Sequence, residues 1–296
     1  MADTELIVPE SGFVGPTPGA APIAELRKQH DPIFWLSVAW MVLVVFSAVF
    51  ANFLPLGDPH AQLAGKPFSA PSFHHPLGTD TVGHDLFNQV IHGARISMTV
   101  AVSSVIVGLS IGGTIGVVAG YARGVVEMIL MWITDVLLAF PALVFALALV
   151  SFAGASIWSV AGAISVLAIP GYARVARAVT LSYSEQTFVL AARAMGGRST
   201  RILVKDILPN VIVPLSSFAA LGAAVAVIAE GALAFLGLGV PSAISWGNMI
   251  AIGQTELYQA PQAAFAPMGA MFLTIVALNF IGERIGTAFD PREGQL

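Results

Sequence analysis

The chain of 296 residues is 56% hydrophobic and only 10% charged, with a formal net charge of −4 and a mean hydropathy of +0.83. Soluble domains carry roughly 25% charged residues, so a chain this poor in charge is predicted to be an integral membrane protein. The chain contains no cysteine, which excludes disulfides, thiolate metal sites and cysteine nucleophiles.

The first 32 residues are polar, mixed in charge and rich in Pro and Gly, which is typical of a mostly disordered tail. The apolar run that follows, at about 33–54, could alternatively be the hydrophobic core of a cleaved signal peptide. That run is too long for such a core, and the segment before it is too long and too acidic. We therefore predict a retained first membrane span.

Apolar runs of membrane-spanning length recur along the chain, since about 20 residues are needed to cross about 30 Å of hydrocarbon. They lie at about 33–54, 96–121, 127–152, 157–181, 208–238 and 265–288. The predicted fold class is all-α, a polytopic membrane protein with six transmembrane helices. Its predicted parts are a cytoplasmic tail (1–32), a first span (33–54), an extracytoplasmic loop (55–95), a core with five further spans (96–288) and a cytoplasmic C-terminal segment (289–296).

The positive charges predict the orientation of these spans. Arg27 and Lys28 precede the first span, Arg123 lies between the second and third, and six more Lys and Arg residues lie at or after the end of the fourth. The loops on the opposite face hold only two basic residues, Lys66 and Arg95. By the positive-inside rule, both termini and the loop 182–207 are predicted to be cytoplasmic.

The loop 182–207 is predicted to be folded. Ser182, with Glu185 three residues later, predicts a capping box and so the start of a helix. Four apolar residues then recur on one helix face, namely Phe188, Ala191, Ala192 and Met195. Gly196-Gly197 is predicted to end this helix, because only glycine enters the left-handed region without steric cost. Ser199 is predicted to cap a second short helix.

Within this loop, Ala191-Ala192, Gly196 and the triplet Leu208-Pro209-Asn210 resemble the "EAA" loop of ABC-importer permeases. In that family the loop forms a coupling helix that docks on an ATPase subunit, so the resemblance implies that ATP-driven motion enters the chain here. Leu190 stands where the family has a glutamate. The residues implied to form the coupling helix are Glu185, Phe188, Leu190, Ala191, Ala192, Arg193, Met195, Gly196 and Gly197. The alternative is an ordinary amphipathic loop.

The outer loop carries a second resemblance, to the segment before the second span in the dipeptide/oligopeptide/nickel branch of these permeases. The matching candidate residues are His75, Gly78, Thr79, Asp80, Gly83, Asp85 and Arg95. Residues 78–80 are predicted to form a turn with a side-chain cap, and residues 84–92 a short helix lying on the membrane. His74, His75, His84 and His92 of this loop do not have the H-x3-H spacing of a metal site, and no metal is predicted.

Glycines and prolines shape the predicted spans. The second span has a glycine at every fourth position, at Gly108, Gly112, Gly116 and Gly120. This face allows close helix contact, and packing within the subunit is preferred over a pore-lining or inter-subunit face. Pro141 is predicted to kink the third span, and Pro170-Gly171 the fourth.

Three polar residues inside the spans are candidates for the translocation path or an inter-subunit contact. Asp135 is predicted to pair with Arg174 or Arg177, although intramembrane carboxylates also mark transport paths. Glu230 either faces a cavity or partner subunit or is hydrogen-bonded within the bundle. Asn279, in the sixth span, is the third candidate.

The sequence offers no catalytic motif. Its three lysines, Lys28, Lys66 and Lys205, do not follow a G-x4-G pattern, so the chain has no Walker A loop to hold ATP phosphates. No cofactor is predicted in this chain, and no enzymatic activity. ATP and Mg²⁺ are expected on a partner ATPase.

The predicted function is that of a permease subunit, the second or C-type of a pair, in a bacterial importer of dipeptides or oligopeptides in the plasma (inner) membrane. The resemblance implies a heterodimer with a second permease, ATPase subunits and an extracytoplasmic substrate-binding protein. Membrane lipid surrounds the chain, and no nucleic acid is expected. The alternatives are import of nickel chelates or haem, an ion-coupled secondary transporter with Asp135, Glu230 or Glu283 as proton relays, and a membrane scaffold.

Overall fold

The computed structural model describes residues 32–56, 58–59, 66–240 and 243–288. Within these ranges the regular structure is helical, which confirms the all-α prediction. The predicted tail, apart from Pro32, and the C-terminal segment 289–296 lie outside the described residues.

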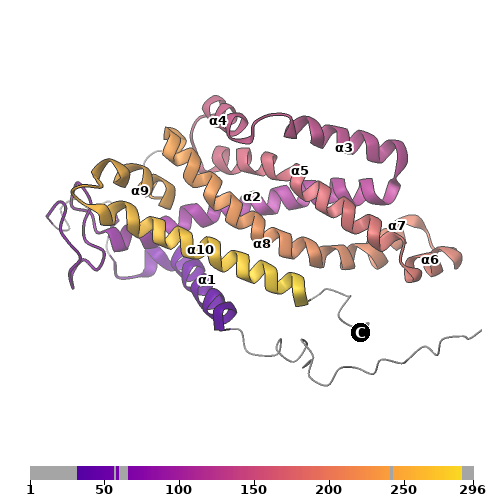
Figure 1. The fold of residues 1–296 in the computed structure, drawn as a ribbon, viewed down its shortest axis with the longest axis horizontal. Coiled ribbons are helices and arrows are strands. Elements are labelled where there is room, and N and C mark those ends of the chain that lie inside the picture. The colour runs from indigo at the N-terminus through magenta and orange to yellow at the C-terminus, as the bar shows by residue number, and fades with distance from the viewer. Residues whose placement is uncertain (1–31, 57, 60–65, 241–242, 289–296) are drawn as a thin grey trace, which may run out of the picture. The chain divides into compact units, whose positions relative to one another are not determined.

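The helices of the described residues are α1 (Pro32–Phe50), α2 (Leu86–Ala122), α3 (Gly124–Leu138), α4 (Ala142–Ala153), α5 (Ile157–Ser184), α6 (Thr187–Ala194), α7 (Ser199–Arg201), α8 (Leu208–Leu233), α9 (Trp246–Gly253) and α10 (Pro261–Ala288) (Figure 1). Shorter segments are the 3-10 turns η2 (Ala51–Phe53) and η5 (Gln254–Glu256) and the π-helical η3 (Ile202–Ile207) and η4 (Ala234–Leu238). Among the described residues, five helical runs are long and apolar enough to cross a membrane, or six if the bent pair α3 and α4 is one span.

α2 begins earlier than predicted. Asp85 is its N-cap, and its Oδ1 accepts hydrogen bonds from the backbone N–H groups of Phe87 and Asn88, at 2.8 and 3.2 Å. A side-chain acceptor satisfies N–H groups that have no partner in the first turn, so the helix starts here. It then continues for 37 residues to Ala122. The separate surface helix predicted at 84–92 was therefore wrong, because that segment is the start of α2.

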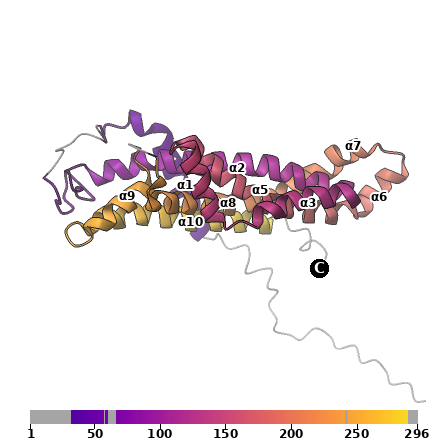
Figure 2. The ribbon, with the colours of Figure 1, turned by 90° about the horizontal axis from the view of Figure 1, so that it is seen from above.

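α2 and α5 pack closely along much of their length (Figure 2). The four glycines of the predicted face, Gly108, Gly112, Gly116 and Gly120, lie in this contact. A Cβ on Gly120 would lie 2.8 Å from the carbonyl oxygen of Arg177, and one on Gly116 would overlap the carbonyl oxygen of Ala173. Since α5 belongs to the same chain, the prediction of packing within the subunit is confirmed.

The third span is bent and the fourth is not interrupted. α3 and α4 meet at an angle of 83°, and Pro141 is the N-cap of α4, so the kink predicted there is confirmed. Proline has no N–H to donate to the preceding turn. α5 continues as one helix through Pro170, so Pro170-Gly171 does not interrupt the fourth span, and the kink predicted there stays a prediction. A packed membrane helix tolerates the loss of one hydrogen bond when its neighbours compensate.

α7, η3, α8 and η4 form one helical run, Ser199–Leu238. The sequence predicted a separate short helix capped by Ser199. Instead Ser199 is the first residue of α7, and the N-cap, Arg198, makes no side-chain cap hydrogen bond. The π-helical segment η3 leads directly from α7 into α8, so no second cap is needed.

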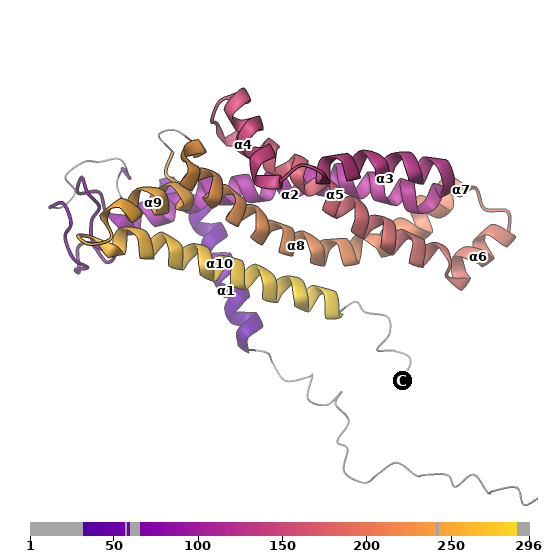
Figure 3. The same cartoon turned by 45° about the horizontal axis from the view of Figure 1, so that its top comes forward.

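Buried apolar side chains form two clusters along the bundle. One contains Leu86 and Trp246, near α9, and the other contains Val117, Val189 and Ile207, near α6. α6 and α9 lie at opposite ends of the bundle (Figure 3). The loop 182–207 and the outer loop are therefore on different ends, as the predicted topology requires.

Candidate functional site

α6 forms the centre of the predicted coupling loop and ends in a glycine cap. The N–H of Gly197 donates to the carbonyl oxygen of Ala192, and the N–H of Gly196 donates to that of Arg193, both at 3.0 Å. Gly196 has a φ of +78°, a conformation that only glycine adopts without steric cost. The predicted glycine bend is confirmed.

The start of α6 differs from the prediction. α5 continues through Ser182 to Ser184, and Glu185 is its C-cap. Gln186 precedes α6 without a side-chain cap. The predicted capping box was wrong, because Ser182 belongs to the last turn of a helix that started far upstream. Glu185 instead accepts a hydrogen bond of 2.8 Å from Arg123.

The apolar residues of α6 face two ways. Val189 is fully buried in the apolar cluster at this end of the bundle, and Ala192 packs against the same cluster. The other apolar residues of α6 and its C-cap are exposed, namely Phe188, Leu190, Ala191, Ala194 and Met195. Met195 is 82% exposed. The predicted single face is therefore divided, and we call the exposed residues Phe188, Leu190, Ala191 and Met195 the α6 patch. Apolar patches of this kind mark interaction surfaces.

Two ion pairs connect α3 with α5. Nη2 of Arg174 lies 2.7 Å from Oδ1 of Asp135, and Nε of Arg177 donates to Oε1 of Glu127 at 2.6 Å. Both pairs line a cavity of about 690 Å³, and Trp132 also lines it. The predicted pairing of Asp135 with an arginine is present, while its part in a translocation path stays a prediction.

Glu230 is buried among hydrogen-bond donors of its own chain. Its carboxylate accepts from the hydroxyls of Ser97, at 3.1 Å, and Ser245, at 2.7 Å, and from the backbone N–H of Gly247. Of the two roles that the sequence left open, the geometry supports hydrogen bonding within the bundle.

Asn279 is exposed on α10 beside a cavity. Its Nδ2 donates to the carbonyl oxygen of Ile275 at 2.8 Å. The cavity, of about 390 Å³, lies between α8 and α10 and is also lined by Ser217, Phe218 and Glu283. This position is compatible with the predicted role of Asn279 in a path.

The outer-loop motif forms a compact turn before α2. Gly78 and Gly83 have φ values of +79° and +86°. Thr79 is buried, and its hydroxyl donates to the carbonyl oxygen of Lys66 at 2.6 Å and accepts from the N–H of Ser69 at 2.9 Å. Residues 78–80 themselves lie between two turns, 75–78 and 80–83, and Oδ1 of Asp80 accepts from the N–H groups of Val82 and His84. The side-chain cap is therefore present, but the turn that it caps begins at Asp80 instead of covering 78–80.

Two histidine–carboxylate pairs close this turn. Nδ1 of His75 lies 2.9 Å from Oδ2 of Asp85, and Nδ1 of His84 lies 2.7 Å from Oδ2 of Asp80. His75 thus holds Asp85, the N-cap of α2, and His84 holds Asp80 of the turn. Arg95, further along α2, is exposed.

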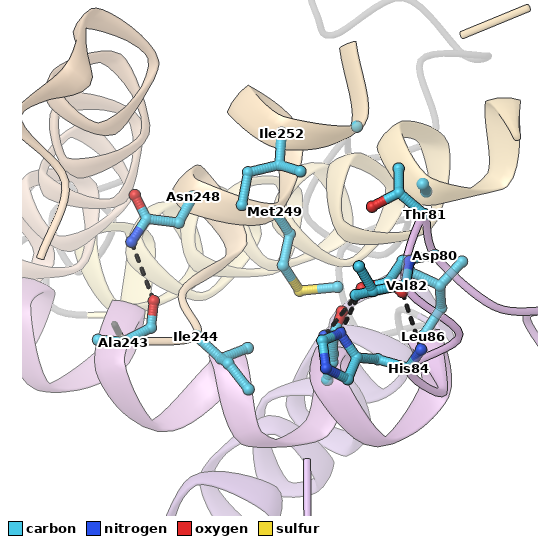
Figure 4. A pocket seen from close by; sticks show the side chains of 13 residues that line it. Asp80, Thr81, Val82, His84, Leu86, Ala243, Ile244, Asn248, Met249 and Ile252 are labelled. Carbon is cyan, nitrogen blue, oxygen red and sulfur yellow. Dashed lines mark hydrogen bonds and ion pairs between the residues drawn. The ribbon is translucent and has the colours of Figure 1, made fainter. Parts of the chain in front are cut away.

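A cavity of about 460 Å³ separates the outer turn from α9 (Figure 4). Met249 reaches from α9 toward Val82 and His84, while Nδ2 of Asn248 donates to the carbonyl oxygen of Ala243 at 2.9 Å. This recess lies at the end of the bundle opposite to α6.

With this geometry in place, comparison with known proteins decides the family. Residues 112–295 match the family described as "binding-protein-dependent transport system inner membrane component". The chain belongs to this family. The predicted ABC-importer permease is thereby confirmed, and the chain is a multi-pass protein of a bacterial inner-membrane transport family.

Relatives of the permease match most of its length. It is 31% identical over 288 residues to the dipeptide transport system permease protein DppC of Alkalihalophilus pseudofirmus, covering 96% of this chain and 93% of the relative. It is 37% identical over 223 residues to the glutathione transport system permease protein GsiD of Pectobacterium atrosepticum (75% and 74%). It is 41% identical over 227 residues to a putative peptide permease protein of Brucella suis (76% and 75%).

Among solved structures, the permease resembles a chain of the MetNI methionine ABC transporter in an inward-facing conformation. The TM-score is 0.59 at 18% identity, and the match covers 69% of this chain and 98% of that chain. At this identity the likeness concerns the fold alone, and it confirms the predicted permease fold.

Sequence reasoning about the permease missed Glu127, which pairs with Arg177. The two residues lie 50 positions apart, so no local pattern joins them. A signal existed in the spacing, because Glu127 and Asp135 lie about two turns apart on α3, and Arg174 and Arg177 lie one turn apart on α5. Two acidic residues on one helix that lie opposite two arginines on another helix predict two ion pairs.

Proposed function

We propose that the permease is one of two membrane subunits of an ATP-driven importer of dipeptides or oligopeptides. The names of its relatives support this substrate class, since they are dipeptide, glutathione and peptide transport permeases. Nickel chelates and haem, which the sequence left open, do not occur in these names.

The α6 patch carries the proposal that ATP-driven motion enters here. This eight-residue helix buries Val189 and exposes Phe188 and Leu190, and Met195 is exposed at its C-cap. One side of α6 is thus packed against the bundle, and the other is open to a partner. Leu190, in place of the glutamate of the family, adds apolar area to this patch. We propose that an ATPase subunit covers it and that ATP and Mg²⁺ bind on that subunit.

The remaining partners follow from this arrangement. Both termini and α6 lie on the cytoplasmic side, and α9 and the outer turn face a substrate-binding protein on the other. The substrate passes between this chain and a second permease, with Asp135 and Asn279 as candidate path residues. Closure of the ATPases moves α6 and opens the path alternately to each side. ATP depletion should abolish uptake, whereas an ion-coupled transporter would stop when the proton gradient collapses.

Replacing Gly196 by valine tests the coupling role. A β-branched side chain at a φ of +78° costs about 1–3 kcal/mol of backbone strain, so the bend behind α6 is displaced. We expect reconstituted vesicles that contain the whole importer to lose most peptide uptake and most peptide-stimulated ATP hydrolysis.

Gly162→Val is the matched control, because a Cβ at Gly162 meets no atom within 4 Å and the backbone there is ordinary helix. If Gly196→Val and Gly162→Val both leave uptake and ATP hydrolysis normal, α6 does not couple the two subunits.

A further inference from the structure

The corner between α2 and α3 is made by a residue in a costly backbone conformation. Arg123 ends α2 and begins α3 with a φ of +54° and a ψ of −179°. Gly124 follows with a φ of +62°. Non-glycine residues persist in such conformations only where the surrounding contacts hold them. Because a glycine would remove this strain, the arginine side chain itself is the feature to explain.

The guanidinium of Arg123 reaches the end of α5, immediately before α6. Its Nη2 lies 2.8 Å from Oε1 of Glu185 and 3.2 Å from Oγ of Ser184. Glu185 and Gln186 are the two residues between α5 and α6. Arg123 at the corner therefore fixes the segment directly before the N-terminus of α6.

A second contact joins the same corner to the last turn of α6. The guanidinium carbon of Arg193 lies 5.6 Å from the centre of the Tyr121 ring, within the range of a cation–π interaction. The Tyr121 ring also packs against the cluster that buries Val189. Arg123 thus contacts Glu185 at one end of the segment 185–193, and Tyr121 contacts Arg193 at the other end.

From the corner, the connection continues into α3. Glu127, one turn further on, and Asp135 bind Arg177 and Arg174 of α5. α3 then ends at the 83° bend before α4. α3 is thus a short helix that runs from the corner beside α6 to the bend before α4.

We propose that the Tyr121–Gly124 corner is a second anchor of α6 and that Arg123 is a positioning residue, which transmits the movement of α6 to α3. This inference rests on the proposed coupling role of α6. The pair is suited to breaking and re-forming in each cycle, because Arg123 is 49% and Glu185 70% exposed and exposed pairs add little to stability.

Charge reversal tests the anchor in vesicles that contain both permeases, the ATPases and the binding protein. The variants are Arg123→Glu, Glu185→Arg and the double reversal. We expect each single reversal to lower the peptide imported per ATP hydrolysed by about two- to fivefold, the range for an exposed ion pair. The double reversal restores the pair and should recover most of this ratio. A residue that only supports folding would change the yield of assembled complex rather than this ratio.

Two further variants separate the anchor from its neighbours. Arg123→Gly relieves the backbone strain and removes the guanidinium, so a lower import ratio with normal assembly supports the anchor. Gly196→Val reports on the coupling role of α6 itself. The inference is overturned if Gly196→Val uncouples import while the Arg123 variants do not, or if the double reversal fails to rescue. If Gly196→Val has no effect either, the proposed function fails with it.

Discussion

At the scale of single residues, Glu230 joins elements that are far apart in the sequence. Its carboxylate on α8 accepts from Ser97 on α2 and from Ser245 at the N-cap of α9. Ser97 in turn accepts from the backbone N–H of Trp246 at 3.2 Å. These bonds fix the segment before α9 against α2, so Glu230 holds the α9 end of the bundle together.

Truncating this side chain should destabilise the permease. Glu230→Ala leaves the hydroxyls of Ser97 and Ser245 and the N–H of Gly247 without their acceptor, at a cost of about 1–3 kcal/mol for each buried unsatisfied group. Glu230→Gln keeps an acceptor oxygen and the side-chain volume. We expect the thermal midpoint of the detergent-solubilised protein to fall clearly in the alanine variant and much less in the glutamine variant. Equal midpoints for the two variants would contradict this role.

At the scale of elements, the close contact between α2 and α5 depends on glycines of α2 that have no side chain. Helices without side chains at the crossing approach closely and gain van der Waals contact, which drives association where lipid already surrounds apolar surfaces. Gly116 lies at such a place, because a Cβ there would overlap the carbonyl oxygen of Ala173 and lie 2.6 Å from the Cβ of Ala176. The two helices form the frame on which α3 and α6 are held.

A side chain at this crossing should separate the helices. Gly116→Val forces a side chain against the backbone of α5, and overpacking of this kind costs about 1–3 kcal/mol or more. Gly113→Val is the control on the same helix, since its nearest neighbours would be ordinary contacts at 3.8 and 3.9 Å. We expect a low yield and a lower thermal midpoint for the first variant only. If both variants behave alike, the glycine face is not what sets the α2–α5 distance.

At the scale of the whole molecule, the sequence predicted what local chemistry or a simple period determines. The spans follow from hydropathy, the glycine face from its four-residue period, and the bends at Pro141 and Gly196 from single residues. The errors at Ser182 and Ser199 arose because each cap signal depends on where the preceding helix stops, and long-range packing decides that.

The contacts of the corner were also outside the reach of local patterns. Arg123 counted only as a positive charge in a short loop, since its partner Glu185 lies 62 positions away. Only the fold brings these two side chains together. The same holds for Glu230 and Ser97, which lie 133 positions apart.

The central claim is that α6 lies on the inner side of the membrane and contacts an ATPase subunit. The chain has no cysteine, so Met195→Cys, in the α6 patch, introduces a single thiol. Tyr258→Cys is the control at the opposite end, since Tyr258 is fully exposed between α9 and α10. In intact cells, a membrane-impermeant maleimide should label the Tyr258 variant and not the Met195 variant. In inside-out vesicles stripped of the ATPase, the Met195 variant should become reactive, and added ATPase should protect it and cross-link to it. Labelling of Met195→Cys from outside, or reactivity that the ATPase does not change, would contradict the account.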